Sequence, residues 1–109
     1  MYYPISTRET FKPDSDTTVY LPPVDAGNMS ATVFIALDGF HGSFVNRLSR
    51  KDYLIASGNI KFTADGKEFE TVAGDIISVP IQTKHAMEGQ GSFFLTTTPP
   101  FDPATEEQI

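Results

Sequence analysis

Two histidines, His41 and His85, are the side chains of this sequence best suited to chemistry near neutral pH. An imidazole with an unperturbed pKa of roughly 6.5 exchanges protons in that range, and its neutral form binds metal ions. The sequence has no cysteine, so disulfides and thiolate chemistry are not available. A mononuclear metal site normally takes three or four protein ligands, and Asp38 or Glu70 would have to complete one. Proton transfer and metal binding therefore both stay open.

The segments that position these residues have the pattern of β-strands. Gly, Pro, Asn or Asp interrupts the chain about every 8 to 12 residues, and β-branched and aromatic residues fill the intervals, as in antiparallel sandwiches and barrels. Asp38 and Gly39 are expected to break the chain, and Asp65 with Gly66 predicts a two-residue hairpin turn. The predicted strands are Thr17–Leu21, Ala31–Leu37, Ser43–Arg47, Asp52–Ser57, Asn59–Ala64, Lys67–Thr71, Ile76–Val79, Lys84–Glu88 and Gly91–Thr98.

Length and composition favour one small domain. The 109 residues form a single expected domain, residues 1–109, with a barrel core at about 17–100 and an acidic tail at 101–109, read as a short helix or a disordered end. The net charge of −6 argues against nucleic acid or an anionic membrane as a partner. No apolar run approaches the roughly 20 residues that span a bilayer, and the start lacks a signal peptide. We expect a soluble, cytoplasmic protein.

One motif connects these strands to a known fold. Gly74 is followed after five residues by Pro80 and after four more by His85, with a Gly-Asp turn between two short strands. This spacing resembles the second motif of the cupin superfamily, and Tyr53 through Gly58 resembles another strand and turn of those proteins. The resemblance, which covers roughly residues 30 to 103, implies a cupin jelly-roll β-barrel, also called a double-stranded β-helix.

The metal-binding half of that resemblance is missing. In the cupin superfamily a first motif, bounded by two glycines, supplies two histidines and a glutamate as metal ligands. With Gly39 and Gly58 as those glycines, the three ligand positions fall on Val45, Arg47 and Lys51. Valine has no donor atom, and Arg and Lys are cationic at neutral pH. We therefore expect no metal and no other cofactor.

The same alignment predicts which side chains face the interior. Residues two apart share a face of a strand, so His41, Ser43, Val45 and Arg47 project together if that strand has no bulge. Lys51 and Tyr53 project inward from the next strand, and His85 from the second motif. An interior with extra positive charge suits an anionic or oxygen-rich small molecule.

The run from Gly39 to Asn46 is similar to a subgroup of small cupins without metal ligands, whose characterised members include a uridine-aldehyde dehydratase. That resemblance implies an interior histidine as general base, with tyrosine and lysine in support. Carried over, His41 is the base and Tyr53 the hydroxyl that orients or protonates a substrate oxygen. The expected substrate-binding residues are Arg47, Lys51, His85, Ser43, Asn46, Met87 and Lys12.

Three functions follow as hypotheses. The first is a metal-independent lyase, such as a dehydratase, or an isomerase, acting on a small carbonyl-containing sugar or nucleoside-like compound. The second is a non-catalytic module that binds a small molecule in the same pocket. The third is a metal-dependent cupin that uses His41, His85 and a recruited carboxylate. Under all three we expect a homodimer, formed by strand exchange or face-to-face packing, because an isolated small barrel leaves apolar edges.

Overall fold

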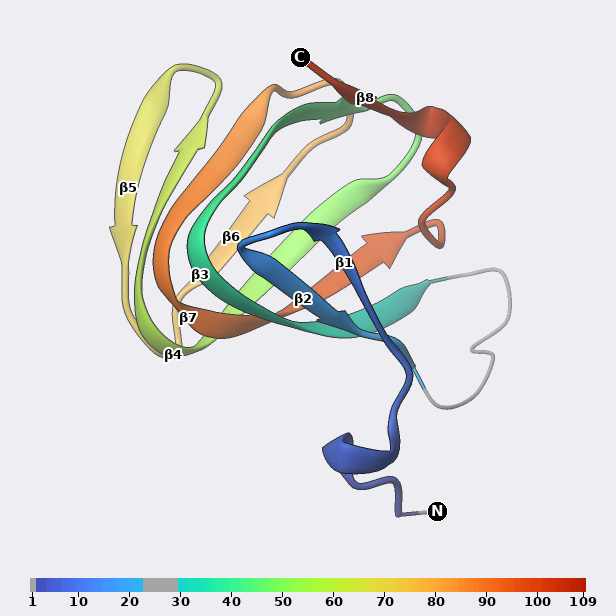
Figure 1. The fold of residues 1–109 in the computed structure, drawn as a ribbon. Helices are drawn as coiled ribbons and strands as arrows, with labels where there is room; N and C mark the ends of the chain where they lie inside the picture. The colour runs from blue at the N-terminus through green and yellow to red at the C-terminus, as the bar shows by residue number, and fades with distance from the viewer. Residues whose placement is uncertain (1, 23–29) are drawn as a thin grey trace.

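The computed structural model describes residues 2–22 and 30–109, which form antiparallel β-strands curved into a barrel (Figure 1). No helix within these residues has the length and apolar character needed to cross a membrane. The all-β prediction is confirmed. The elements, in chain order, are η1 (Ile5–Thr7), β1 (Thr10–Asp14), β2 (Thr17–Tyr20), β3 (Ala31–Asn46), β4 (Arg50–Ala64), β5 (Lys67–Thr71), β6 (Ile76–Val79), β7 (His85–Thr98), η2 (Pro103–Thr105) and β8 (Glu106–Gln108).

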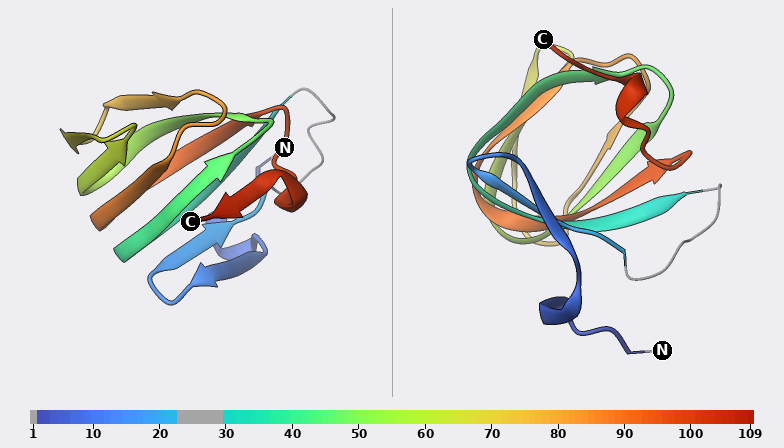
Figure 2. Two further views of the ribbon diagram at one scale, coloured as in Figure 1. Left: turned by 90° about the horizontal axis from the view of Figure 1, so that it is seen from above. Right: turned by 45° about the vertical axis from the view of Figure 1, so that its right-hand side comes forward.

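Three long strands, β3, β4 and β7, each contribute to both walls of the barrel (Figure 2). In the first wall the strand order is β1-β2-β3-β7-β4-β6, with β7 residues 90–98 in the centre. In the second wall the order is β8-β3-β7-β4-β5, and β7 residues 85–89 lie in the centre. The strands therefore bend once, where they pass from one wall to the other.

Glycines lie at these bends. Asp38 and Gly39 do not break the chain as expected, because β3 keeps its pairing with β7 through Gly39, whose φ is 132°. In β4, Gly58 has a φ of 81°, and a Cβ there would collide with the backbone carbonyl of Gln90. Two predicted strands therefore merge into one at each bend, since the backbone turns without losing its hydrogen-bonded neighbour.

The barrel is packed at one end and open at the other. Large side chains from the two walls fill the packed end, where the rings of Tyr53, Phe62 and Phe93 meet edge to face at 5.0 to 6.2 Å between centroids. These rings are at most 1% exposed. Such edge-to-face clusters stabilise a core beyond the area they bury. The open end forms the cavity described below.

The ends of the chain depart most from expectation. The short strands β5 and β6 have the predicted bounds, and Asp65 and Gly66 both take positive φ, as a two-residue hairpin turn requires. The tail, however, forms one 3-10 turn followed by β8, which pairs with Phe44–Asn46. The edge of β3 would otherwise be unpaired at that point, and the tail supplies the missing neighbour. Strand β1 has no counterpart among the predicted strands.

We predict that Gly58→Ala lowers the free energy of unfolding by about 2–4 kcal/mol. The substitution combines a positive φ with a clash against backbone that cannot move away. The matched control is Gly66→Ala, where φ is 76° but a Cβ meets nothing within 4 Å. That change should cost about 1 kcal/mol. Urea unfolding measures both, and equal losses would contradict the steric role of Gly58.

Candidate functional site

A cavity of about 400 Å³ occupies the open end of the barrel. Aliphatic and aromatic side chains line most of it, and polar groups gather on one side. This composition is typical of sites for small organic molecules. Its wall includes Phe11, Asp14, Val19, Leu21, Val33, Ile35, His41, Phe44, Lys51, Tyr53, Leu95, Phe101, Glu106 and Gln108.

His41 lies in the cavity wall, bound to a carboxylate that the sequence analysis did not select. Its Nδ1 lies 2.5 Å from Oδ2 of Asp14, at the end of β1. Burial by itself raises the pKa of Asp14, but the hydrogen bonds from His41 and from the backbone N–H of Asp16 outweigh it and lower that pKa. Because an ionised carboxylate only accepts hydrogen bonds, Nδ1 carries the proton and Nε2 holds the free lone pair. In the neutral ring, this contact therefore leaves the lone pair on Nε2.

A bulge in β3 changes which residues face inward. The register between β3 and β7 shifts between Gly42 and Phe44, so Phe44 and Asn46 are buried in place of Ser43 and Val45. The prediction that Ser43, Val45 and Arg47 point into the barrel with His41 is therefore wrong. A bulge inserts one residue and inverts every later position on the strand.

Arg47 lies outside the cavity. Its guanidinium donates to the carbonyl of Ala104 at 2.8 Å and lies 3.5 Å from Glu107, and its side chain is 51% exposed. Arg47 therefore connects β3 to Ala104 and Glu107 of the tail on the outer side of the barrel.

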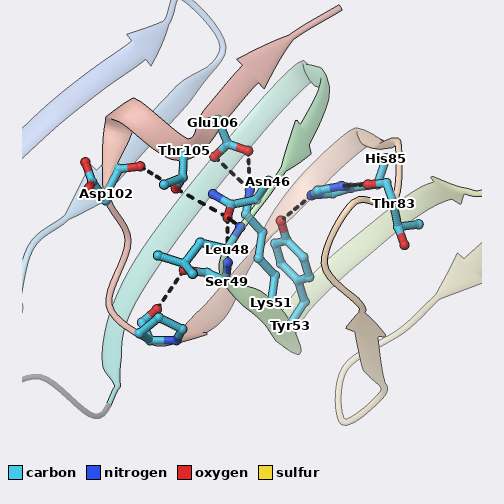
Figure 3. Close-up of polar contacts among 11 residues, drawn as sticks. Asn46, Leu48, Ser49, Lys51, Tyr53, Thr83, His85, Asp102, Thr105 and Glu106 are labelled. Atoms are coloured by element: carbon cyan, nitrogen blue, oxygen red, sulfur yellow. Dashed lines mark hydrogen bonds and ion pairs between the residues drawn. The ribbon is translucent and has the colours of Figure 1, made fainter.

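Lys51 does face inward, but it is not a free cation. Its Nζ donates to both carboxylate oxygens of Glu106 at 2.9 Å, and the two side chains are 4% and 19% exposed (Figure 3). Nζ also lies 4.4 Å from the centre of the Phe44 ring. Burial lowers the pKa of Lys51, and the charge and hydrogen bonds of Glu106 partly offset that effect. Glu106 comes from the tail, which the sequence analysis treated as a solvated end.

Tyr53, which lines the cavity, forms a buried hydrogen-bonded pair with His85 (Figure 3). His85 Nδ1 lies 2.9 Å from the carbonyl of Thr83, which can only accept, so Nδ1 carries the proton. Burial and the nearby charge of Lys51 lower the pKa of His85 to about 4. Its Nε2 is therefore a bare acceptor, and the Tyr53 hydroxyl donates to it at 3.2 Å. Burial and the Glu106 charge raise the pKa of Tyr53, so the phenol stays protonated.

Three other candidates lie away from the cavity. Met87 is 1% exposed and belongs to the packed core. Asn46 is also buried, and its Oδ1 accepts from the backbone N–H groups of Leu48 and Ser49, which shapes the turn between β3 and β4. Lys12 lies on the outer side of β1, where its Nζ donates to Thr18 at 3.1 Å. None of the three lines the cavity within the described part of the chain.

The geometry does not suit a metal site built on both histidines. Both ring nitrogens of His85 have partners, and the ring of Phe44 packs against each imidazole with 4.8 Å between centroids. Within residues 2–22 and 30–109, no three His, Cys, Asp or Glu side chains are grouped as metal ligands would be.

The polar groups of the cavity come from segments that sequence patterns identify poorly. Asp14 follows a proline at the end of a strand that was not predicted, and Glu106 lies in the tail. For Asp14 the sequence signal is the preceding Pro13, since Pro-Asp pairs favour turns. For Glu106 it is the spacing of two residues to Gln108, which would place both side chains on one face of a strand after Pro103. At neutral pH the wall holds one lysine and two carboxylates, Asp14 and Glu106. Among the described residues of this wall, the expected surplus of positive charge is therefore absent.

No protein-family model and no curated protein sequence matches the chain. Solved structures do. Pac13 of Streptomyces, described as a unique nucleoside dehydratase, superposes with a TM-score of 0.90 at 22% identity, over 100% of this chain and 90% of Pac13. KdgF from a Halomonas species gives 0.82 at 13% identity over 95% and 97%. An RmlC-like cupin from Shewanella frigidimarina gives 0.77 at 18% identity over 86% of each chain. The chain has the cupin fold.

We predict that His85 makes stability pH-dependent between pH 7 and pH 5. A pKa lowered from 6.5 to about 4 means that the unfolded chain binds this proton first, so stability is complete above pH 6.5 and falls toward pH 4. The free energy of unfolding should drop by about 2 kcal/mol between pH 7 and pH 5. Urea unfolding of the wild type and of His85→Gln at both pH values measures it. An equal drop in His85→Gln would contradict the assignment.

We also predict that Glu106→Gln destabilises the protein by about 3 kcal/mol, because it leaves Lys51 buried without a counter-charge. The matched control is the adjacent Glu107→Gln, whose partner Arg47 is exposed, and which should cost less than about 0.5 kcal/mol. Adding Lys51→Met to Glu106→Gln should recover most of the loss. Equal effects of the two single variants in urea unfolding would show that the buried pair contributes no more than a surface pair.

Proposed function

We propose that this chain is a metal-independent lyase, of the dehydratase type, or an isomerase, that acts on a small, uncharged carbonyl compound of the sugar or nucleoside kind. The observation that carries the proposal is the His41 ring, which Asp14 holds with its Nε2 lone pair free at the wall of the cavity. A carboxylate on Nδ1 fixes the tautomer and stabilises the imidazolium that forms when Nε2 takes a proton. The likeness to Pac13 supports the dehydratase reading.

The reaction begins with proton abstraction. His41 Nε2 takes the proton from the carbon next to the carbonyl, and the electron pair of that C–H bond moves onto the carbonyl oxygen to give an enolate. Tyr53 and Lys51 both line the cavity, and in this step the Tyr53 hydroxyl and the Lys51 ammonium stabilise the negative oxygen. Lys51 remains a donor because Glu106 keeps it protonated.

Two outcomes are open to the enolate. In a dehydration the enolate re-forms the carbonyl group and expels the hydroxyl group on the β-carbon. His41 gives its proton to that hydroxyl group, which leaves as water. The product is an α,β-unsaturated carbonyl compound. In an isomerisation of an α-hydroxy carbonyl compound, the α-hydroxyl proton moves to the former carbonyl oxygen, His41 returns its proton to the former carbonyl carbon, and the carbonyl group forms at the α-carbon. Both leave the enzyme in its starting protonation state without an external oxidant or reductant.

The charges in the wall favour an uncharged substrate. With Lys51 paired to Glu106 and Arg47 outside, the wall carries one positive and two negative charges when His41 is neutral. Among the described wall residues, a phosphate or carboxylate would meet no free cation and would face two carboxylates. The sequence left an anionic and an oxygen-rich ligand both open, and these charges favour a neutral, oxygen-rich one.

We predict that the protein releases water from a nucleoside aldehyde, or exchanges its α-proton with D2O, and that His41→Gln slows this by at least about 100-fold. Tyr53→Phe should slow it by about 10- to 100-fold through loss of the oxyanion donor. Lys61→Gln, a cation outside the cavity in an exposed ion pair, is the control and should leave the rate unchanged. Mass spectrometry follows water loss, and NMR follows exchange.

Binding without turnover or exchange, in wild type and His41→Gln alike, would identify the second hypothesis, a non-catalytic binding module. Turnover that disappears on chelation and returns with added metal would contradict the metal-independent mechanism. The phosphorylated form of the same aldehyde tests the charge argument, since tighter binding of that form would overturn it.

A further inference from the structure

The cavity has an apolar side that takes no part in the proposed proton transfer. Its side chains come from the first wall, where β2, β3 and β7 are neighbours. Cross-strand pairing puts Val19 beside Ile35 and Val33 beside Leu95, so the surface continues from strand to strand. These side chains and the adjacent Leu21 are called the apolar floor below: Val19, Leu21, Val33, Ile35 and Leu95.

The apolar floor begins next to the reacting groups. Leu95 pairs on its other side with Tyr53 of β4, so the two side chains point to the same face of the sheet. Both line the cavity, as does His41. A carbonyl group held at Tyr53 therefore has the apolar floor as its neighbour on the β7 side.

The apolar floor offers no hydrogen bond to a ligand. Its side chains carry no polar atoms, and β3 and β7 are each paired on both sides, so their backbone N–H and C=O groups are used within the sheet. Among the described wall residues, the uncharged polar side chains lie toward the ion pair: Thr97 pairs with Lys51, and Gln108 pairs with Phe44. A polar group buried on the floor would lose its hydrogen bonds to water and gain none.

The shape of the apolar floor suits a flat ring. Three of its residues, Val19, Val33 and Ile35, are β-branched and therefore have few rotamers. Three strands spaced about 4.8 Å apart, with two residue ranks separated by about 7 Å, give a surface on the order of 10 by 7 Å. That is the size of one aromatic ring with its attachment. Phe11 and Phe101 line the cavity while 45% and 43% exposed, so they lie where it opens.

We propose that the substrate carries an apolar aromatic ring, which packs on the apolar floor while its carbonyl group lies at His41 and Tyr53. The inference rests on the proposed function, because that function places the carbonyl group. An aryl ring gains hydrophobic contact on the floor and loses no hydrogen bond. A nucleobase of similar size gains the same contact but leaves the carbonyl and N–H groups of its edge without partners on the floor. The substrate is thus an aryl-bearing sugar derivative in preference to a nucleoside.

The test is calorimetric binding of two uncharged ligands to the full chain. One is uridine, and the other is the phenyl C-riboside, in which benzene replaces the base. Both carry a 5′-alcohol and no aldehyde, so neither is turned over. The phenyl compound should bind at least tenfold more tightly than uridine.

Val33→Thr shows whether the preference comes from the apolar floor, since it adds a hydroxyl there at almost the same side-chain volume. It should weaken binding of the phenyl compound at least fivefold and change uridine binding less than twofold. Val72→Thr is the matched control, because Val72 is 55% exposed and does not line the cavity. It should leave both affinities unchanged. A urea titration establishes that each variant is folded, and Leu21→Thr replaces Val33→Thr if the latter is not.

Wild-type protein that binds uridine as tightly as the phenyl compound would overturn the inference. So would a floor variant that weakens both ligands equally or neither. These outcomes are independent of the proposed chemistry, since the ligands lack the reacting carbonyl group. A preference for the phenyl compound together with no water loss or proton exchange from either aldehyde would support the aromatic ligand and contradict the proposed function alone.

Discussion

The passage of β3, β4 and β7 through both walls is the constraint on which the rest of the structure depends. Because each strand bends once, it supplies residues to one wall before the bend and to the other after it. Tyr53 and Lys51 precede the bend of β4, whereas His41 follows the bend of β3. The catalytic candidates therefore meet across the junction of the two walls. A straight strand would have placed them on one flat sheet.

The open end of this barrel is completed by the two edge strands, and each brings one carboxylate. Asp14 at the end of β1 holds His41, and Glu106 at the start of β8 holds Lys51. Lys51 is a buried charge whose loss of Glu106 would cost several kcal/mol, so this ion pair fixes the position of β8. The hydrogen bond from the His41 ring to Asp14 connects β3 to β1 at the cavity. The polar side of the cavity thus depends on segments at the two ends of the chain.

The sequence was informative where local patterns decide the structure. Alternation and turn residues predicted β5, β6 and the hairpin between β4 and β5, and the spacing from Gly74 to His85 predicted the fold. His41, Lys51 and Tyr53 do line the cavity, but strand parity misplaced Val45 and Arg47. One inserted residue inverts a face. Gly42, at the register shift, is a residue type that often marks a bulge, but it does not by itself show whether the register shifts. Asp14 and Glu106 were missed because their partners are 27 and 55 residues away in sequence, beyond the reach of local patterns.

His85 occupies a position where the cupin resemblance suggested a metal ligand, and in this structure its ring contacts Tyr53 and Thr83 instead. Its neutral ring accepts the only proton of the Tyr53 hydroxyl, so in the resting site His85 holds that proton. In the proposed reaction the same proton must turn toward the substrate oxygen, which leaves a buried imidazole nitrogen unpaired at a cost of about 1–3 kcal/mol. A neutral carbonyl offsets little of that cost, whereas an enolate oxygen forms a stronger, charge-assisted hydrogen bond. In the proposed reaction, competition from His85 therefore makes the Tyr53 hydrogen bond stronger to the enolate than to the bound carbonyl. A hydrogen bond that strengthens as the enolate forms lowers the barrier to proton abstraction, whereas one of equal strength in both states would only tighten binding.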